Sequence, residues 1–281
     1  MSDASTPSPL VVLVHGAWHG AWCYAALQAE LDARGIASLA IDLPGHGAST
    51  LPLGDLHGDA QHVADVVAAL DRPVVLVGHS YGGAVISEAA VRVAREGTGP
   101  VRHLVYLTAF TPDEGESIGT LLGGMPRVSV LLNAAITPRD DGTSVLEPAA
   151  AIPALYGSCP PAVAAASVAR LSPQPMSTFG QPVTGTARAG TPTTYVVCTE
   201  DRAIAVEHQQ IMATRCDTVV TLHTDHSPFA SMVADRGTFG APGAGGGVPR
   251  GAAGRGAVAA ARLAGRARRG AGAPGGVGAR R

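Results

Sequence analysis

The chain has 281 residues, of which 46% are hydrophobic, and its formal net charge at pH 7 is −2. This length fits one domain with an insertion or two small domains, and the near-neutral charge gives no reason to expect a polyanionic partner. The charge is unevenly distributed, because residues 237–281 contain eight Arg and no Asp or Glu. The residues before them therefore carry −2 − 8 = −10.

Cysteine usage and the N-terminal sequence bear on the cellular compartment. Cys23, Cys159, Cys198 and Cys216 form no C-x-x-C pair and have no metal-like spacing, which indicates free thiols in a reducing compartment. Residues Met1–Pro9 are polar and do not resemble a signal peptide. No apolar run reaches the length of about 18 residues that spans a membrane. We therefore predict a cytoplasmic protein without a membrane span, a metal or another cofactor.

From residue 10 to residue 111, short apolar runs alternate with helix-like segments. The runs are too short for helices and are typical of strands buried on both faces. Such alternation predicts an α/β fold, with a mostly parallel sheet that helices cover on both faces. We predict strands at Leu10–Val14, Ile36–Ile41, Val74–Val77 and Val101–Leu107, and helices at Ala21–Arg34, Asp59–Leu70 and Ala84–Arg95.

The alternation stops between Pro112 and Gly190, where Pro, Gly, Ala and Ser dominate. Since a loop of this length usually has a function, we interpret residues 112–190 as a cap inserted over the carboxyl ends of the strands. The alternative is a surface excursion without function. The core then comprises residues 10–111 and 191–236, after a flexible leader at residues 1–9. Its second part is predicted to hold strands at Thr193–Cys198 and Thr218–Leu222 and helices at Val206–Thr214 and Phe229–Asp235.

Residues 237–281 differ in character from the rest of the chain. They contain fifteen Gly in 45 residues and almost no periodic apolar face. Where a hydrophobic helix should continue over the edge of the sheet, the sequence has Gly, Ala and Arg. We predict a disordered or weakly helical basic tail. Its composition is also that of GC-rich DNA read out of frame, and we do not expect it to bind nucleic acid.

The sequence PVVLVGHSYGG, at residues 73–83, contains G-x-S-x-G between a predicted strand and a predicted helix. In that setting the serine occupies a sharp turn that exposes its hydroxyl, and small residues must flank it. Gly78 and Gly82 meet this requirement around Ser80. We therefore predict that Ser80 is a nucleophile. The alternative is a buried serine in a glycine-rich turn.

A serine nucleophile needs a histidine as its base and a carboxylate that orients the histidine. In this type of sheet both lie on later loops, with the acid before the histidine. Asp201 follows one of the later predicted strands and His226 follows the next. The sequence therefore predicts a catalytic triad of Ser80, Asp201 and His226.

Each partner of the serine has a rival nearby. Glu200 adjoins Asp201, and Asp113 follows the fourth strand, where some related sheets carry the acid. His223 precedes His226 by three residues, although it lies at the strand end rather than on the loop. Asp201 could also serve only as a cap for the helix that follows it.

Acyl transfer also needs two N–H donors for the oxyanion of the tetrahedral intermediate. One comes from the residue after the nucleophile, which is Tyr81. The other comes from the turn after the first strand, where Ala17 in His15-Gly16-Ala17 is best placed. The remaining histidines show no ligand-like clustering, so we predict structural roles for them and no metal site.

Five motifs resemble the α/β-hydrolase superfamily: VLVHGAWHGAWCY, VGHSYGG, YLTAFTPDEG, VVCTEDRAI and TDHSPF. They are similar to the branch that holds the plant methylesterases (the salicylate-binding esterases) and the hydroxynitrile lyases. The resemblance covers about residues 10–236. It implies an α/β-hydrolase fold with the triad Ser80, Asp201 and His226 and the oxyanion donors Ala17 and Tyr81.

Two positions depart from the lyases of this branch. Those lyases carry Thr after the first-strand His and Lys after the catalytic His, where this chain has Gly16 and Ser227. Because the cation that stabilises cyanide is missing, the resemblance does not imply lyase activity. The esterase pattern is retained.

We therefore predict an enzyme, a serine hydrolase that cleaves small carboxylic esters through an acyl-enzyme intermediate. The same site could serve a lyase, lactonase or cyclase step of a biosynthetic pathway, because this fold hosts many reactions. A further hypothesis is a non-catalytic protein that binds small molecules on this scaffold.

Overall fold

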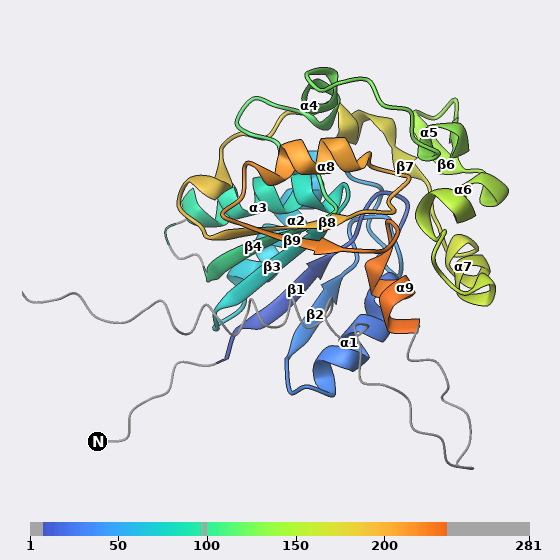
Figure 1. The fold of residues 1–281 in the computed structure, drawn as a ribbon. Helices are drawn as coiled ribbons and strands as arrows, with labels where there is room; N and C mark the ends of the chain where they lie inside the picture. Colours follow the sequence, from blue (N-terminus) through green and yellow to red (C-terminus); the bar gives the residue numbers. More distant parts are fainter. Residues whose placement is uncertain (1–7, 96, 98–99, 235–281) are drawn as a thin grey trace, which may run out of the picture.

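The computed structural model describes residues 8–95, 97 and 100–234. Its centre is a six-stranded sheet with the order β2-β1-β3-β4-β8-β9, in which every neighbouring pair is parallel (Figure 1). The strands are β1 (Leu10–Val14), β2 (Ser38–Ile41), β3 (Val74–His79), β4 (Val101–Leu107), β8 (Thr193–Cys198) and β9 (Thr218–Leu222). The predicted bounds of β1, β4, β8 and β9 are confirmed. Strand β2 begins two residues later than predicted, and β3 ends two residues later, at His79.

Burial explains why these segments form strands. All residues of β1, β3 and β8 are buried, as expected for strands with helices on both faces. The edge strand β9 is largely exposed, and its Val219 is 52% exposed. Continuous apolar runs thus mark β1 and most of β3, whereas β8 and the edge strand β9 each contain two Thr and differ in burial rather than in polarity.

Helices cover both faces of the sheet, and each face has its own core. Helices α2, α3 and α8 pack with Val12, Leu76 and Leu104 on one face. Helices α1 and α9 pack with Val77 and Val105 on the other face (Figure 1). The predicted α/β fold is therefore confirmed. The helices are α1 (Ala25–Asp32), α2 (Leu56–Ala68), α3 (Gly82–Arg95), α8 (Val206–Ala213) and α9 (Pro228–Ala234), and a 3-10 turn, η1 (Ala21–Tyr24), precedes α1.

Four helix starts differ from the sequence prediction, and α3 and α9 differ least, since they begin two residues and one residue early, at Gly82 and Pro228. Helix α2 begins at Leu56, three residues before the predicted start, because the Asp55 side chain accepts a hydrogen bond from the amide of Gly58 and caps the helix. The segment predicted as a helix from Ala21 begins as η1 and becomes α-helical only at Ala25.

Residues 112–190 contain short helices and strands that were not predicted from the sequence. Figure 1 shows them along the top and right of the sheet. Three of the strands, β5 (Ile136–Pro138), β6 (Thr143–Leu146) and β7 (Gln174–Pro175), form a small antiparallel sheet. The other elements are α4 (Ile118–Gly123), α5 (Leu132–Ala135), α6 (Pro148–Leu155), α7 (Pro161–Val168), η2 (Met176–Phe179) and η3 (Ala187–Ala189).

The predicted tail, residues 237–281, and most of the predicted leader, residues 1–9, lie outside the described residues. Within the described ranges, no helix is both long and apolar enough to cross a membrane. A cavity on the α1 and α9 face is lined by apolar side chains alone, among them Leu31, Val77 and Phe229. Since no polar side chain lines it, it is not a candidate for chemistry.

Candidate active site

Backbone strain marks one end of the sheet. Three non-glycine residues in the described part have positive φ: Trp18 at 63°, Ser80 at 53° and Thr108 at 38°. They follow β1, β3 and β4, which are neighbours in the sheet, so all three lie at the carboxyl ends of adjacent parallel strands. Ligands bind at this edge of open α/β sheets, and strained residues persist where the surrounding structure holds them.

Ser80 occupies the sharp turn between β3 and α3. Its carbonyl accepts hydrogen bonds from the amides of Gly83 at 3.0 Å and Phe110 at 3.2 Å, and its amide donates to Leu107 O. A Cβ atom on Gly78 would lie 2.4 Å from the carbonyl oxygen of Gly82. The turn therefore has the geometry that the G-x-S-x-G sequence predicts, with glycine required beside the serine.

We expect Gly78→Ala to lower the free energy of unfolding by about 3 kcal/mol, because the new methyl group collides with main chain that has nowhere to move. Chemical denaturation measures the change. Gly123→Ala is the matched control, since a Cβ there meets nothing within 4 Å and the residue ends helix α4. Equal stability of the two variants would contradict the assigned turn geometry.

The structure brings Asp201 and His226 into direct contact. His226 Nδ1 donates to Asp201 Oδ2 at 2.7 Å, and both side chains are almost fully buried. The same carboxylate oxygen also accepts from Thr108 Oγ1 and Gln209 Nε2. A carboxylate held in this way orients the imidazole and stabilises it when it becomes charged.

The other oxygen of Asp201 holds the loop itself. Asp201 Oδ1 accepts from the amides of Ala203 at 2.7 Å and Ile204 at 2.9 Å. Asp201 does not cap helix α8, as the alternative supposed, because the N-cap of that helix is Ala205 and no side chain caps it. The bonds of Asp201 with Ala203 and Ile204 instead hold the loop before the helix. This role coexists with the histidine contact, because the two roles use different oxygens.

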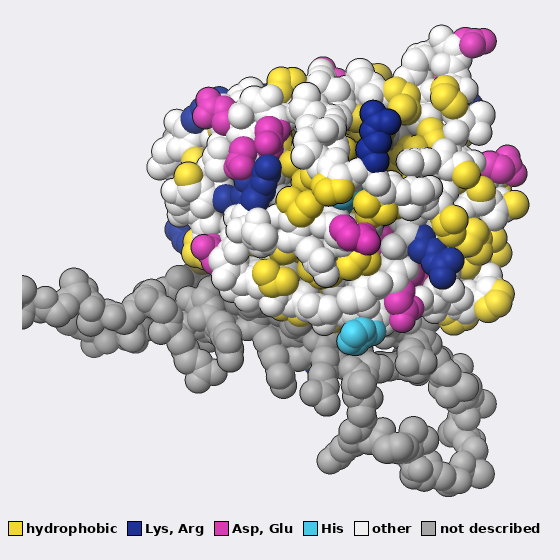
Figure 2. Space-filling model, turned by 45° about the horizontal axis from the view of Figure 1, so that its top comes forward, with side chains coloured by type: hydrophobic (Ala, Val, Ile, Leu, Met, Phe, Trp, Pro, Cys, Tyr) yellow, Lys and Arg dark blue, Asp and Glu magenta, His cyan; other side chains and the backbone are white. Residues whose placement is uncertain are grey.

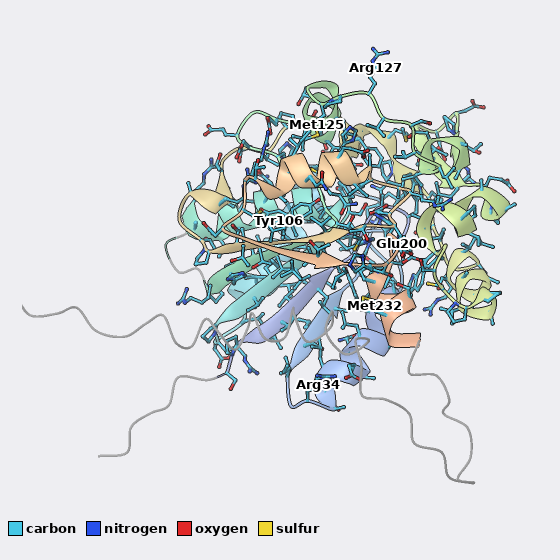
Figure 3. The ribbon with its side chains drawn as sticks, in the orientation of Figure 1. Arg34, Tyr106, Met125, Arg127, Glu200 and Met232 are labelled. Carbon is cyan, nitrogen blue, oxygen red and sulfur yellow. The ribbon has the colours of Figure 1, made fainter. Side chains whose placement is uncertain are left out.

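The rival residues lie elsewhere. Asp113 forms an ion pair with Arg188 and lies 3.3 Å from Arg215. Glu200 is exposed and accepts from Ser158 Oγ at 3.0 Å (Figure 3). His223 is exposed, and its Nδ1 lies 3.1 Å from Thr199 Oγ1.

His79 joins the serine turn to His226. Its Nε2 donates to the main-chain carbonyl of His226 at 2.8 Å, and the two rings lie 4.5 Å apart. Among the described residues, no hydrogen bond links Ser80 Oγ to the His226 ring. Catalytic hydrogen bonds often tighten only when substrate binds, so the proton transfer between these two groups is part of the proposal below.

The main-chain amides at the site include two, at the serine turn and on the neighbouring loop, that have no partner among the residues described. In the described part of the chain, the amides of Ala17 and Tyr81 donate no hydrogen bond. Both residues are buried, and Gly16 brings their two loops together, since a Cβ on it would lie 2.9 Å from Ser80 Cβ. Unpaired buried amides are rare, and an oxyanion would satisfy both.

The buried histidines beside this site are neutral. Burial lowers the pKa of His15 to about 3 and that of His19 to about 4, and it lowers the pKa of His79 well below its usual range. His15 and His19 each donate from Nδ1 to a carbonyl of the loop after β1 and accept at Nε2. Within the described ranges, no three His, Cys, Asp or Glu residues are grouped to hold a metal ion.

A buried carboxyl touches the residue after the serine. The Tyr81 hydroxyl donates to Asp59 Oδ2 at 2.7 Å, while Asp59 Oδ1 is buried without a partner. Burial, opposed in part by the hydrogen bond from Tyr81 and assisted by the nearby Asp55 carboxylate, raises the pKa of Asp59 from 3.8 to about 7. The folded protein therefore holds a proton here that the unfolded chain releases between about pH 4 and pH 7.

Because the unfolded state binds fewer protons in that range, the free energy of unfolding should fall as the pH rises from 4 to 7. Asp59→Asn cannot ionise. It should therefore reduce by about one the difference between the numbers of protons that the folded and unfolded states bind in this pH range. Urea unfolding of both proteins at several pH values tests this. Asp65→Asn, at an exposed position of the same helix, is the control. Identical slopes for wild type and Asp59→Asn would contradict the prediction.

The groups that hold Asp201 and His226 in place were not predicted from the sequence. Thr108 and Gln209 bind Asp201, and His79 binds His226. His79 and Thr108 had a signal, because each lies at the carboxyl end of a central strand. Gln209 had none, since it is one polar residue in a helix.

Comparisons with known proteins agree with this geometry. Residues 11–237 match the alpha/beta hydrolase family. A carbendazim hydrolyzing esterase from Nocardioides sp. is 42% identical over 115 residues, which is 40% of this chain and 46% of that enzyme. Methylesterase 1 from Arabidopsis thaliana is 29% identical over 78% of this chain and 89% of its own length. The predicted resemblance to methylesterases is thereby confirmed.

A solved structure is similar over most of the chain. The crystal structure of a pyrethroid hydrolase from Sphingobium faniae JZ-2 superposes with a TM-score of 0.72 at 26% identity. The match covers 91% of this chain and 97% of that one. The two proteins therefore share their fold over nearly the whole length of that enzyme.

Proposed function

Because the chain belongs to the alpha/beta hydrolase family, we propose that it hydrolyses small carboxylic esters with Ser80 as the nucleophile. The observation that carries the proposal is the buried hydrogen bond between His226 and Asp201, at the end of the sheet where Ser80 occupies a strained turn. Esterase and hydrolase relatives support the reaction class.

In the first step, His226 Nε2 takes the proton of Ser80 while Ser80 Oγ attacks the ester carbonyl carbon. The carbonyl oxygen becomes an oxyanion and accepts from the amides of Ala17 and Tyr81. Asp201 stabilises the imidazolium that forms. The intermediate collapses, the alcohol leaves with the proton from His226, and the acyl group stays on Ser80.

In the second step, His226 Nε2 takes a proton from water, and the hydroxide attacks the acyl carbon. The same two amides hold the second oxyanion. Collapse breaks the bond to Ser80 Oγ, which recovers its proton from His226, and the carboxylic acid is released. No step needs a metal or a cofactor.

The substrate proposed is a small neutral ester. Relatives are named for carbendazim and for pyrethroids, so related sites act on small molecules. Figure 2 shows that the face carrying the inserted segment presents hydrophobic side chains among single charges, without a broad patch of one sign. We propose that residues 112–190 act as the cap that selects the substrate and that the protein works in the cytoplasm.

Rapid mixing with p-nitrophenyl acetate tests the proposal. An acyl-enzyme mechanism should release a burst of nitrophenol equal to the enzyme concentration, or steady turnover if deacylation is fast. Mass spectrometry of the quenched protein should find the acetyl group on the peptide that contains Ser80. Ligand binding without any acylation or turnover would favour the non-catalytic hypothesis.

A further inference from the structure

The residue after the proposed oxyanion donor Ala17 is held by the inserted segment. Trp18 has a strained main chain with φ of 63°. Its amide donates to Gln174 Oε1 at 3.3 Å and its carbonyl accepts from the amide of Ser172 at 2.9 Å. Its indole Nε1 donates to Ser144 Oγ at 3.2 Å. A strained residue persists only when its surroundings hold it, and here residues 144–174 do so.

The peptide groups around Ala17 are fixed on both sides. The carbonyl of Gly16 accepts from His15 Nδ1 at 2.8 Å, and the carbonyl of Ala17 accepts from His19 Nδ1 at 2.8 Å. Since the C=O and N–H of a trans peptide point in opposite directions, these bonds orient the neighbouring amides. The Ala17–Trp18 peptide has its carbonyl held by His19 and its amide held by Gln174. In these two peptides, the Ala17 amide is the group that makes no hydrogen bond to any described residue.

Two side chains of the inserted segment bind the main chain of Trp18: Ser172 Oγ donates to its carbonyl at 3.5 Å, and Gln174 Oε1 accepts from its amide. Of these two, Gln174 is the one that holds the amide. It is completely buried in the small strand β7. Its Oε1 also accepts from His46 Nε2 at 3.0 Å, and its Nε2 donates to Thr178 Oγ1 at 3.1 Å. A buried amide is costly unless its groups are paired. The burial of the Gln174 amide with these partners therefore indicates a specific structural role in addition to packing.

We propose that Gln174 is a positioning residue for the oxyanion hole, acting through the Trp18 amide to hold the Ala17 amide toward Ser80. The inference rests on the proposed ester hydrolysis. If Gln174 has this role, the inserted segment helps to position the oxyanion hole, in addition to any role in substrate selection.

Gln174→Met tests the proposal, because Met has nearly the same volume but cannot accept from Trp18 or His46. We expect kcat/KM to fall tenfold to a hundredfold, roughly the effect of a small misplacement at a reacting centre. The fall should lie in kcat, with KM nearly unchanged. The inhibition constant of an aliphatic trifluoromethyl ketone, which adds to the serine as a tetrahedral oxyanion, should rise by the same factor.

Two further variants separate positioning from packing. Gln174→Glu keeps an acceptor oxygen and should restore most of kcat. Thr178→Val removes the bond at the other end of the same amide, away from Trp18, and should change kcat less than threefold. Circular dichroism shows whether Gln174→Met folds. If it does not, Gln174→Asn takes its place in the comparison, because the shorter side chain withdraws the amide oxygen from Trp18 by one methylene.

The proposal is overturned if Gln174→Met behaves like Thr178→Val, or if only KM rises while the ketone inhibits both proteins equally. Failure of the wild-type protein to bind the ketone covalently at Ser80 is a different result. It would contradict the proposed ester hydrolysis itself and remove the premise of the inference.

Discussion

Replacing Ser80 by Ala should lower kcat for p-nitrophenyl acetate on the order of 10⁴-fold or more, with no burst of nitrophenol. In the proposed mechanism, the variant lacks the oxygen atom that carries the acyl group. It keeps the turn, because Ala has the same Cβ at the same positive φ and leaves the glycines beside it unchanged. Stopped-flow absorbance measures the burst, and thermal unfolding shows that the fold is retained.

Ser87→Ala is the matched control for this prediction. Ser87 is also a buried serine, but its hydroxyl donates to the carbonyl of Gly83 inside helix α3 and lies 2.9 Å from the Tyr106 hydroxyl. Its loss should affect stability and leave kcat within a few-fold of wild type. Turnover by Ser80→Ala at the wild-type rate would remove Ser80 from the mechanism.

The second large effect is expected at Asp201. Asp201→Asn should lower kcat about 10⁴-fold, although the residue keeps its shape. The Asn oxygen can still accept from the amides of Ala203 and Ile204, so its NH₂ group would face His226. A donor at that position favours the His226 tautomer with its proton on Nε2, and that nitrogen can then no longer take the proton of Ser80.

Glu200→Gln provides the comparison, since it neutralises the neighbouring carboxylate, which contacts Ser158 at the surface. It should change kcat less than threefold. Nitrophenol release at saturating ester, measured for both variants, distinguishes the two acids. A larger loss in Glu200→Gln than in Asp201→Asn would reverse the assignment.

The central strands were predictable because their signal is local. A parallel strand with helices on both faces favours apolar side chains at successive positions, and Leu10–Val14 in β1, Val74–Val77 in β3 and Leu104–Leu107 in β4 meet that requirement. The order of serine, acid and histidine along the chain was predictable for a similar reason. Each residue directly follows a strand, and parallel strands bring their carboxyl ends to one edge.

The inserted segment was not predictable in detail. Its helices are four to eight residues long, and several consist mainly of Ala and Pro. Such segments have no periodic pattern, and packing against the rest of the molecule decides their structure. Gln174 lies in a strand of only two residues, so its buried amide gave no sequence signal.

The sequence established the sheet, the turn at Ser80 and the glycines that this turn requires, because these depend on neighbours along the chain. The choice between Glu200 and Asp201 needed the tertiary structure, since both are carboxylates that follow the same strand. Asp201 holds its own loop with one oxygen, and this aims the other at His226. The contact of Gln174 with Trp18 likewise joins residues 156 apart, which only the folded chain brings together.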